Sequence, residues 1–233
     1  MGKTTNHSKA IQERKRQERE KRIQDILNAA KRLFFCKGYL KMTMDDIALE
    51  VRVSKPTIYQ FFKTKDELFF SLMIPASEKT EKELGEIERN VLDRRYTSGS
   101  ALLHEIFQAL YSVYQADPEA FRILQLFQQS GMVWALNEEV RRNLVAKARS
   151  TFSLGRSILQ AAMEQGLVHR RDIYPLNDVI WALFVGIVQL EDTKKKEKGD
   201  DRFLKPAMEM AEHLLIEAMA TDWSRTARLP LEK

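Results

Sequence analysis

The chain has 233 residues, of which 44% are hydrophobic and 30% charged, with a net charge of +5 and one cysteine. This length suits one or two globular domains, and a single cysteine excludes an intramolecular disulfide. The apolar run 179–188 is too short to span a bilayer, and the charged N-terminus does not resemble a secretory signal, so we expect no membrane partner and a cytoplasmic protein.

Two helices are predicted first. An apolar stripe with a helical period starts at Ile23, and we expect this helix to end at Lys37-Gly38, because glycine is favoured just past the last turn. Thr43 predicts the cap of a second, short helix together with Asp46, whose negative charge suits a helix N-terminus. This second helix should stop near Val51.

A third helix is predicted over Lys55–Phe62, with Ser54 as its cap. A short positioning helix, a tight turn and a second helix define a helix-turn-helix, whose second helix enters the major groove of DNA. The run Thr64-Lys65-Asp66-Glu67 predicts a capping box that opens a long fourth helix. Pro75 should kink that helix or remove one of its backbone hydrogen bonds.

The order of these residues resembles the TetR family of transcriptional regulators. The positions that carry the resemblance are Ile26, Leu27, Ala29, Ala30, Leu33, Phe34, Gly38, Thr43, Asp46, Ile47, Ala48, Val53, Ser54, Ile58, Tyr59, Phe61, Phe62, Lys65 and Leu68. The resemblance implies an all-α fold, with an N-terminal three-helix DNA-binding domain and a C-terminal helical bundle for ligand binding and dimerisation. The segments expected are a basic arm or helix extension over 1–21, the helix-turn-helix domain over 22–66, the effector and dimerisation domain over 67–222, and a tail over 223–233.

DNA contacts are expected from both parts of the helix-turn-helix. On the resemblance, the recognition helix contributes Lys55, Pro56, Thr57, Tyr59 and Gln60. Lys55 suits a guanine and Thr57 a thymine methyl group, whereas Tyr59 is either a phosphate contact or a core aromatic residue. The residues expected near phosphates are Thr43, Arg52, Lys63 and Lys65.

Arg52 departs from the family pattern, which has glycine at the bend. We predict that Arg52 still adopts the left-handed conformation there, at a cost of roughly 1 kcal/mol, with its side chain exposed or near a phosphate. The alternative is an ordinary surface arginine.

Positive charge is confined to the helix-turn-helix end. Residues 1–66 contain sixteen Lys or Arg against eight Asp or Glu, which gives a net charge of +8, whereas the remainder has a net charge of −3. A basic surface beside a DNA-reading helix neutralises phosphates. The densest run, 9–22, either extends the first helix as a solvated end or touches DNA as an arm.

The remainder of the chain predicts further helices. Their starts are expected at Ser98 or Ser100, Asp117-Pro118, Asn137 and Asn177-Asp178, and their ends at Gly166, Pro175 and Gly199. The run 179–188 is apolar on all sides and requires cover from its own domain and from a second subunit. The dimer residues expected on the resemblance are Val179, Leu183, Val185, Gly186, Met208, Ala211 and Leu215; Lys194–Gly199 is expected to be a solvated connection.

An effector pocket is also implied by the resemblance. The candidates are large or hydrogen-bonding side chains in the middle helices: Phe107, Tyr111, Gln125, Gln128, Trp134, Phe152 and Trp181. Each of them also fits an ordinary core or surface position.

Catalysis has little support in the sequence. Cys36 is expected to pack in the core, and no metal site, cofactor or catalytic group is predicted. His104 with Glu105 is the one modest pair that an all-helical enzyme could use.

These observations predict a prokaryotic, nucleoid-associated homodimer that binds palindromic operator DNA and represses transcription until a small molecule releases it. The first alternative is a DNA-binding adaptor that acts through protein partners without an effector, and the second is a helical enzyme. Effector, operator, and repressor or activator sign are not encoded in any recognisable motif.

Overall fold

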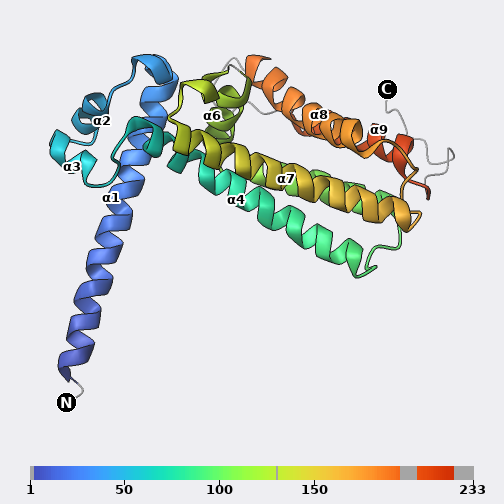
Figure 1. Cartoon of the computed structure of the whole chain (residues 1–233), viewed down its shortest axis with the longest axis horizontal. Coiled ribbons are helices and arrows are strands. Elements are labelled where there is room, and N and C mark those ends of the chain that lie inside the picture. Colours follow the sequence, from blue (N-terminus) through green and yellow to red (C-terminus); the bar gives the residue numbers. More distant parts are fainter. Residues whose placement is uncertain (1–2, 130, 195–203, 223–233) are drawn as a thin grey trace. The chain divides into compact units, whose positions relative to one another are not determined.

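The structure is a computed structural model that describes residues 3–129, 131–194 and 204–222. Its regular elements are helices (Figure 1), and in the described ranges the β-structure is limited to one isolated bridge between Val168 and Ala220. The predicted all-α fold is therefore confirmed. The chain divides into two compact units: unit 1 comprises Met1–Pro75 and Arg122–Arg142, and unit 2 comprises Ala76–Phe121 and Asn143–Lys233.

Unit 1 contains the helix-turn-helix. Its elements are α1 (Lys3–Lys41), α2 (Met44–Glu50), α3 (Lys55–Tyr59), the first part of α4 (Lys65–Leu92), the last part of α6 (Pro118–Gln129), the 3-10 helix η1 (Met132–Ala135) and the start of α7 (Glu138–Glu164). This unit is larger than the expected domain 22–66, because it continues to Pro75 and includes a segment from the middle of the chain.

Helix α1 is interrupted at the predicted glycine. Gly38 has φ 74° and ψ 161°, so the regular helix ends before it and a short turn follows as far as Lys41. The N-terminal part of α1 extends beyond the other helices of unit 1 (Figure 1), and residues 11–22 are exposed along this extension. Thus 9–22 extends the first helix, which was one of the two predicted states of this run.

Helix α2 begins with the predicted capping box. The Asp46 backbone N–H donates to Thr43 Oγ1 at 3.1 Å, and the Thr43 backbone N–H donates to Asp46 Oδ2 at 3.0 Å. Lys37 donates to the same carboxylate at 2.7 Å, and this bond, with those from Thr43, lowers the pKa of Asp46 to about 2. Ser54 is the N-cap residue of α3, as predicted, but its side chain forms no capping hydrogen bond, because its hydroxyl pairs with Thr57 Oγ1 at 2.8 Å.

Arg52 adopts the predicted bend. Its φ is 56°, the Arg52 N–H donates to Leu49 O at 3.1 Å, and the Val53 N–H donates to Ala48 O at 2.9 Å. These two bonds form a Schellman motif, which requires a left-handed residue just past the helix end and is normally filled by glycine. Arg94 closes α4 in the same way, with φ 55° and the corresponding bonds from Arg94 to Val91 and from Arg95 to Asn90.

The two arginines allow a matched test of backbone strain. We expect Arg52→Gly to raise the free energy of unfolding by roughly 0.5–1 kcal/mol, because glycine adopts positive φ without a Cβ clash. Urea unfolding would measure this change, and Arg94→Gly in unit 2 should stabilise by a similar amount. If Arg52 also contacts a phosphate, only Arg52→Gly should weaken DNA binding; unchanged or lower stability in both variants would contradict the strain argument.

Helix α4 starts at the predicted cap with one difference. The Glu67 N–H donates to Thr64 Oγ1 at 3.0 Å, but the Glu67 carboxylate accepts from the Lys63 N–H at 2.8 Å and not from Thr64. The helix continues through Pro75, which lies where unit 1 ends.

The core of unit 1 is an aromatic cluster formed by Phe34, Tyr39, Phe69 and Phe127. The Tyr39 ring lies 5.0 Å from Phe127 and 5.1 Å from Phe69, in edge-to-face geometry. Phe69 and Phe127 are fully buried. Because Phe127 belongs to α6, the helix-turn-helix is completed by a residue outside the segment that predicted it.

Unit 2 is a helical bundle. It contains the rest of α4, α6 and α7, with α5 (Gly99–Ala116), α8 (Ile173–Lys194) and α9 (Leu204–Met219). Ser98, Asp117 and Asn137 accept the predicted capping bonds from Ala101, Ala120 and Val140. Gly166 ends α7 with φ 73°, as predicted.

The predicted start of α8 at Asn177-Asp178 is wrong. The helix begins at Ile173, because the Asp172 carboxylate accepts from the Tyr174 N–H at 3.1 Å and Pro175 is tolerated in the first turn instead of ending a helix. Asn177 is consequently inside the helix and 9% exposed. Of the predicted solvated connection, Lys194 is exposed and the rest lies outside the described residues, as do Gly199 and the tail 223–233.

Helix α8 is unusually apolar. Within the described ranges it is the one helix whose length and composition would also suit a membrane, over Ile173–Glu191, with 28% of that window buried in the chain. In unit 2 it packs against α9 and contributes Phe184 and Val188 to the core. The composition of α8 alone therefore does not show whether a bilayer or a protein surface covers its remaining apolar face.

Candidate functional site

The predicted reading residues lie on the exposed side of α3. Ile58 is fully buried and fixes this short helix to the core, while Lys55, Pro56 and Gln60 are exposed and Thr57 is half-buried. Tyr59 is 41% exposed, so it is a surface side chain and not a core aromatic residue. The helix thus presents a small set of donors, acceptors and apolar groups to a partner.

Lys55 is held by a carboxylate of the positioning helix. Its ammonium lies 2.9 Å from Asp45, and both side chains are more than half exposed. This hydrogen bond raises the pKa of Lys55. An exposed pair of this kind contributes little to stability and is exchanged easily for a phosphate or a base.

The expected phosphate contacts differ in whether their side chains are free to meet DNA. Lys63 and Arg52 are exposed. Lys65, however, donates to the backbone oxygens of Tyr39 at 2.8 Å and Met42 at 3.1 Å, and its ammonium lies 4.3 Å from the Tyr39 ring centroid. Burial lowers the pKa of Lys65. Its expected phosphate contact is therefore corrected to an internal tether between α4 and the end of α1.

A polar network beside this tether was missed by sequence reasoning. Asp66 accepts from the Tyr39 hydroxyl and, through its second oxygen, from the Asn137 backbone N–H at 2.7 Å and side-chain amide at 3.0 Å. Burial and the Asp66 carboxylate raise the pKa of the Tyr39 phenol. Asn137 also caps α7, so the first residues of α7 are fixed inside unit 1. No local pattern links these residues, which lie 71 positions apart.

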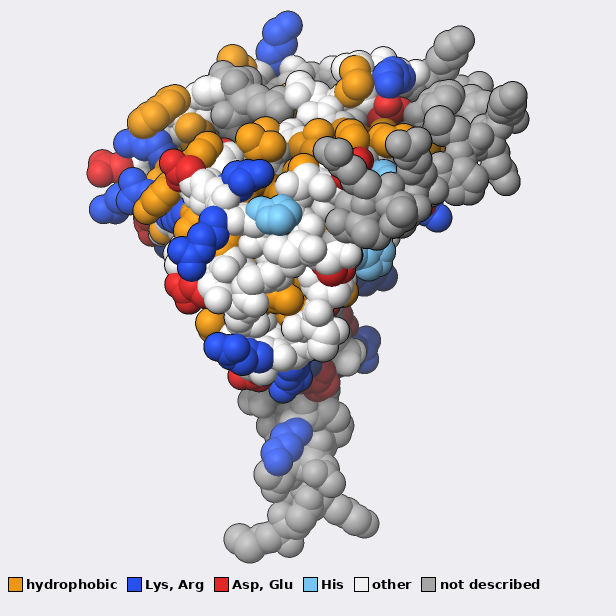
Figure 2. All heavy atoms as spheres, turned by 90° about the vertical axis from the view of Figure 1, so that its right-hand side faces the viewer, with side chains coloured by type: hydrophobic (Ala, Val, Ile, Leu, Met, Phe, Trp, Pro, Cys, Tyr) orange, Lys and Arg blue, Asp and Glu red, His pale blue; other side chains and the backbone are white. Residues whose placement is uncertain are grey.

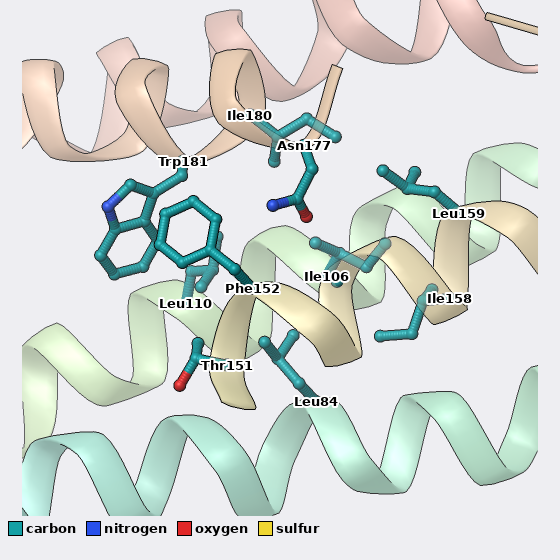
Figure 3. A pocket seen from close by; sticks show the side chains of 11 residues that line it. Leu84, Ile106, Leu110, Thr151, Phe152, Ile158, Leu159, Asn177, Ile180 and Trp181 are labelled. Carbon is teal, nitrogen blue, oxygen red and sulfur yellow. The ribbon is translucent and has the colours of Figure 1, made fainter. Parts of the chain in front are cut away.

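Unit 2 contains an apolar cavity between α4, α5, α7 and α8 (Figure 3). Its volume is about 40 Å³, which is room for a few water molecules. The lining residues are Leu84, Ile106, Leu110, Thr151, Phe152, Gly155, Ile158, Leu159, Asn177, Ile180 and Trp181. No lining residue carries a charge, so a neutral and mainly apolar occupant would fit.

Asn177 is the buried polar group of this cavity. Its side-chain amide points into the space between α7 and α8 (Figure 3), and it forms no hydrogen bond with another side chain of the described ranges. Gly155 allows this approach, because a Cβ at Gly155 would lie 2.1 Å from Asn177 Oδ1. An amide that faces an apolar lining favours a guest with a group that can form a hydrogen bond to it.

Of the seven residues expected in the pocket, the structure places two in the lining of the cavity and corrects the assignment of most others. Phe152 and Trp181 line the cavity with ring centroids 5.9 Å apart, but Phe107 and Tyr111 belong to the surrounding core. Gln125 and Trp134 lie in unit 1. Gln125 is buried there with an unpartnered side-chain nitrogen, and Trp134 is 73% exposed under Arg141. The side chain of Gln128 lies outside what the structure describes.

A second concavity, of about 300 Å³, lies between α4 and α5. It is lined by Glu83, Glu86, Ile87, Glu105, Gln108, Ala109, Ser112 and Gln115. The lining of this groove is acidic and polar, in contrast to the apolar lining of the cavity.

The expected dimer residues separate into two faces. Val185, Met208, Ala211 and Leu215 are buried in the core of their own bundle, so their assignment is corrected. Leu183 is half-buried, while Val179 and Gly186 are exposed. The helical period explains the error, because a helix that is apolar all round does not reveal which side its own chain covers.

The exposed apolar residues of the two C-terminal helices form what we term the α8–α9 apolar surface. Its members are Val179, Ala182, Gly186 and Leu190 of α8 and Met210, Leu214 and Ala218 of α9. Figure 2 shows a band of hydrophobic side chains in the upper part of the molecule, the height at which α8 and α9 lie in Figure 1, with charged side chains around it. Apart from the neighbouring backbone of α8, a Cβ at Gly186 would meet no atom of the described residues within 4 Å.

The residues considered for catalysis do not converge. Cys36 is exposed, so the expected core position is wrong. His104 pairs with Glu212 of α9 at 2.5 Å, whereas Glu105 lines the acidic groove. In the part of the chain that the structure describes, no three His, Cys, Asp or Glu residues are placed to hold a metal ion.

The geometry of unit 1 defines a class, a helix-turn-helix DNA-binding regulator. The family model described as "Bacterial regulatory proteins, tetR family" matches residues 26–72, from the core of α1 into α4. Residues 26–72 therefore form the DNA-binding domain typical of the TetR family of transcriptional regulators.

Among curated proteins, the chain is 24% identical over 164 residues to the uncharacterized HTH-type transcriptional regulator YhgD of Bacillus subtilis, covering 70% of this chain and 80% of YhgD. It is 28% identical over 106 residues to the transcriptional activator FasR of Mycolicibacterium smegmatis, covering 46% of each. Both matches are to helix-turn-helix regulators.

Solved structures show the same fold. The SmeT–triclosan complex has a TM-score of 0.65 at 17% identity and covers 91% of this chain and 99% of SmeT. AibR in complex with isovaleryl coenzyme A and operator DNA has a TM-score of 0.63 at 17% identity, covering 83% of this chain and 97% of AibR. At this identity the likeness concerns the fold alone.

Proposed function

We propose that this protein is a ligand-responsive transcriptional regulator, in the first instance a repressor, that binds palindromic operator DNA as a homodimer and is released by a small molecule. The observation that carries the DNA-binding part is the exposed reading face of α3, held on a buried Ile58 and flanked by exposed cations. The protein would act in the cytoplasm, on nucleoid DNA, and not as an enzyme. FasR, by contrast, is named an activator, so the sign of regulation is part of what an experiment must establish.

The proposed base contacts are Lys55, Pro56, Thr57 and Gln60, and the proposed phosphate contacts are Thr43, Arg52, Tyr59 and Lys63. Phosphate contacts position a protein on any duplex, whereas base contacts specify the sequence. The Thr43 hydroxyl also serves the α2 cap, so a phosphate there would share it with Asp46.

This division predicts different phenotypes. Lys63→Ala should weaken binding to all duplexes by a similar factor and reduce the salt slope of log K by about 1, whereas Gln60→Ala should cost about 1–3 kcal/mol at one operator position only. Binding to an operator selected from random duplexes, and to its point variants, would measure both. Equal losses on every sequence for Gln60→Ala would contradict its role in reading bases.

The apolar cavity supports the ligand-responsive part of the proposal. Its apolar lining, the aromatic pair Phe152 and Trp181, and the side-chain amide of Asn177 suit an uncharged, mainly apolar effector with one hydrogen-bonding group. Ligand pockets usually measure about 300–1,000 Å³, so an effector must enlarge the present space of about 40 Å³. The SmeT and AibR structures, which contain triclosan and isovaleryl coenzyme A, support effector binding within this fold.

Enlargement of the cavity by an effector would provide a route to the release of operator DNA. Helices α4 and α7 both line the cavity and both begin inside unit 1, at Lys65 and next to Asn137. A ligand that favours a displaced α4 or α7 would favour a different placement of the reading helices, and operator DNA must then weaken ligand binding by the same factor.

Release by triclosan and by uncharged aromatic or acyl compounds tests this function directly. We expect at least one compound to weaken operator binding, and Asn177→Leu to reduce that compound's affinity about tenfold, the equivalent of one lost hydrogen bond. Titration calorimetry would measure the affinity. Asn143→Leu, at an exposed position on the same α7 that lines the cavity, is the control and should bind normally.

The adaptor alternative is favoured by one observation, the small size of the cavity. An adaptor would bind its operator equally well in the presence of every compound, and Asn177→Leu would stabilise unit 2 by removing a buried amide from an apolar lining. Operator binding that is insensitive to the whole series, together with a more stable Asn177→Leu variant, would establish the adaptor.

We also propose that the α8–α9 apolar surface is the dimer interface. Its exposed apolar side chains form one row on α8 and one on α9, and the other sides of these two helices pack in the core of unit 2. A two-fold dimer would bury this surface against itself and present two reading helices to two half-sites.

A further inference from the structure

The exposed extension of α1 is a second candidate for contact with DNA. Between residues 9 and 22 the chain has seven Lys or Arg and three Glu. The extension is helical, residues 11–22 are exposed, and Figure 1 shows it projecting from unit 1. A 14-residue helix is about 20 Å long, which corresponds to about six base pairs of DNA at 3.4 Å per step.

One contact orients this extension relative to the reading helix. The Arg19 guanidinium lies over the Phe61 ring, 5.7 Å from its centroid, and Phe61 comes two residues after the end of α3. Ile23 and Ile26 follow Arg19 on the same side of α1, where they become half-buried and buried. The side of the extension that carries Arg19 is therefore the side that faces α3.

Charges are sorted around the extension. At about 100° per residue, Lys15 and Arg22 lie within about 60° of Arg19, whereas Glu13, Glu18 and Glu20 are each about 100° or more away. The carboxylates pair elsewhere: Glu18 binds Arg14 at 2.9 Å, and Glu13 binds Arg16 at 2.7 Å. Among the described residues, no ion pair involves Lys15, Arg19 or Arg22. We term these three cations the α1 basic stripe.

We propose that the α1 basic stripe binds the phosphate backbone of the duplex on which α3 sits, so that each subunit holds DNA through two elements. This inference rests on the proposed operator binding by α3. The physical reason is that unpaired cations gain most from a partner of high negative charge density, and a duplex supplies one charge per 1.7 Å or so of its axis. The contact is independent of sequence, because the stripe has no planar or short polar side chain other than arginine with which to read a base.

The test uses the full-length protein and compares two pairs of substitutions with equal charge. Lys15→Gln with Arg22→Gln removes two cations of the stripe, while Arg14→Gln with Lys21→Gln removes two exposed cations from the opposite side, about 140° or more from Arg19. Binding to a random-sequence 40-base-pair duplex is followed by fluorescence anisotropy from 50 to 200 mM KCl.

We expect the stripe pair to weaken binding and to reduce the salt slope of log K by about 2, because each lost phosphate contact removes about 0.9. The opposite pair should change the slope by less than half as much. The charge-conserving variant Lys15→Arg with Arg22→Lys should bind the duplex as tightly as the unaltered protein. Equal slopes for both pairs, or no change in either, would overturn the inference while leaving operator binding intact. An unaltered protein that fails to bind any duplex would instead overturn the proposed function together with this inference.

Discussion

Phe127→Ala is expected to destabilise unit 1 by about 3–5 kcal/mol, the usual cost of truncating a fully buried phenylalanine. Phe127 is 0% exposed and its ring contacts those of Phe34, Tyr39 and Phe69, so its loss opens the aromatic cluster on every side. Because these residues hold α1 and α4 together, we expect DNA binding to be lost as well. Hydrogen exchange, followed by segment, would show loss of protection in α1 to α3.

The neighbouring residue provides the control. Leu126 is 40% exposed on the same helix, and Leu126→Ala should change the free energy of unfolding by no more than about 0.5 kcal/mol. Protection in α8 and α9 should remain in both variants, since these helices belong to unit 2. If Phe127→Ala left α1 to α3 protected, the compact DNA-binding unit would end at Pro75 and would not include α6.

Leu214→Arg is expected to convert the proposed dimer to a monomer and to weaken operator binding about 100-fold or more. Leu214 is 55% exposed within the α8–α9 apolar surface, where a guanidinium would be buried without a partner on dimerisation. The loss of affinity follows because two linked reading helices gain about 10²–10⁴ in avidity over one. Sedimentation velocity would give the oligomeric state and anisotropy the affinity for the selected operator.

Leu92→Arg is the matched control, since Leu92 is 59% exposed at the end of α4 and lies outside that surface. It should remain dimeric with unaltered affinity. A Leu214→Arg variant that sediments as a dimer would place the interface elsewhere. A monomer with full operator affinity would show that one subunit suffices, and would contradict the proposed two-fold operator.

Much of unit 1 was predictable because its signals are local. The capping residues Thr43 and Asp46, the glycine at 38 and the left-handed Arg52 each depend on neighbours within a few positions, and the structure has them as predicted. The missing capping hydrogen bond at Ser54 is also a local effect, since the Ser54 hydroxyl pairs with the Thr57 side chain and not with the backbone. The local sequence contains both possible partners, the backbone N–H and the Thr57 hydroxyl, and does not indicate which of them Ser54 binds.

The pocket and the outer surfaces were predicted poorly for a different reason. Apolar helices such as α8 carry residues that suit a core, a cavity wall or a partner equally well, and a one-residue difference of about 100° decides among them. Thus Val185 lies in the core and Gly186 on the surface, and Gln125 belongs to unit 1 although its sequence position suggested an effector pocket.

The sequence by itself determined the all-α fold, the helix-turn-helix and the asymmetric distribution of charge, because these follow from capping, periodicity and composition along short stretches. Only the tertiary structure decided that Lys65 is an internal tether, that Asp66 binds Asn137, that Asn177 faces a small cavity, and that Arg19 turns a basic stripe toward α3. Each of these depends on contacts between segments far apart in the chain. Their geometry is set by how whole helices pack, which no short stretch of residues encodes.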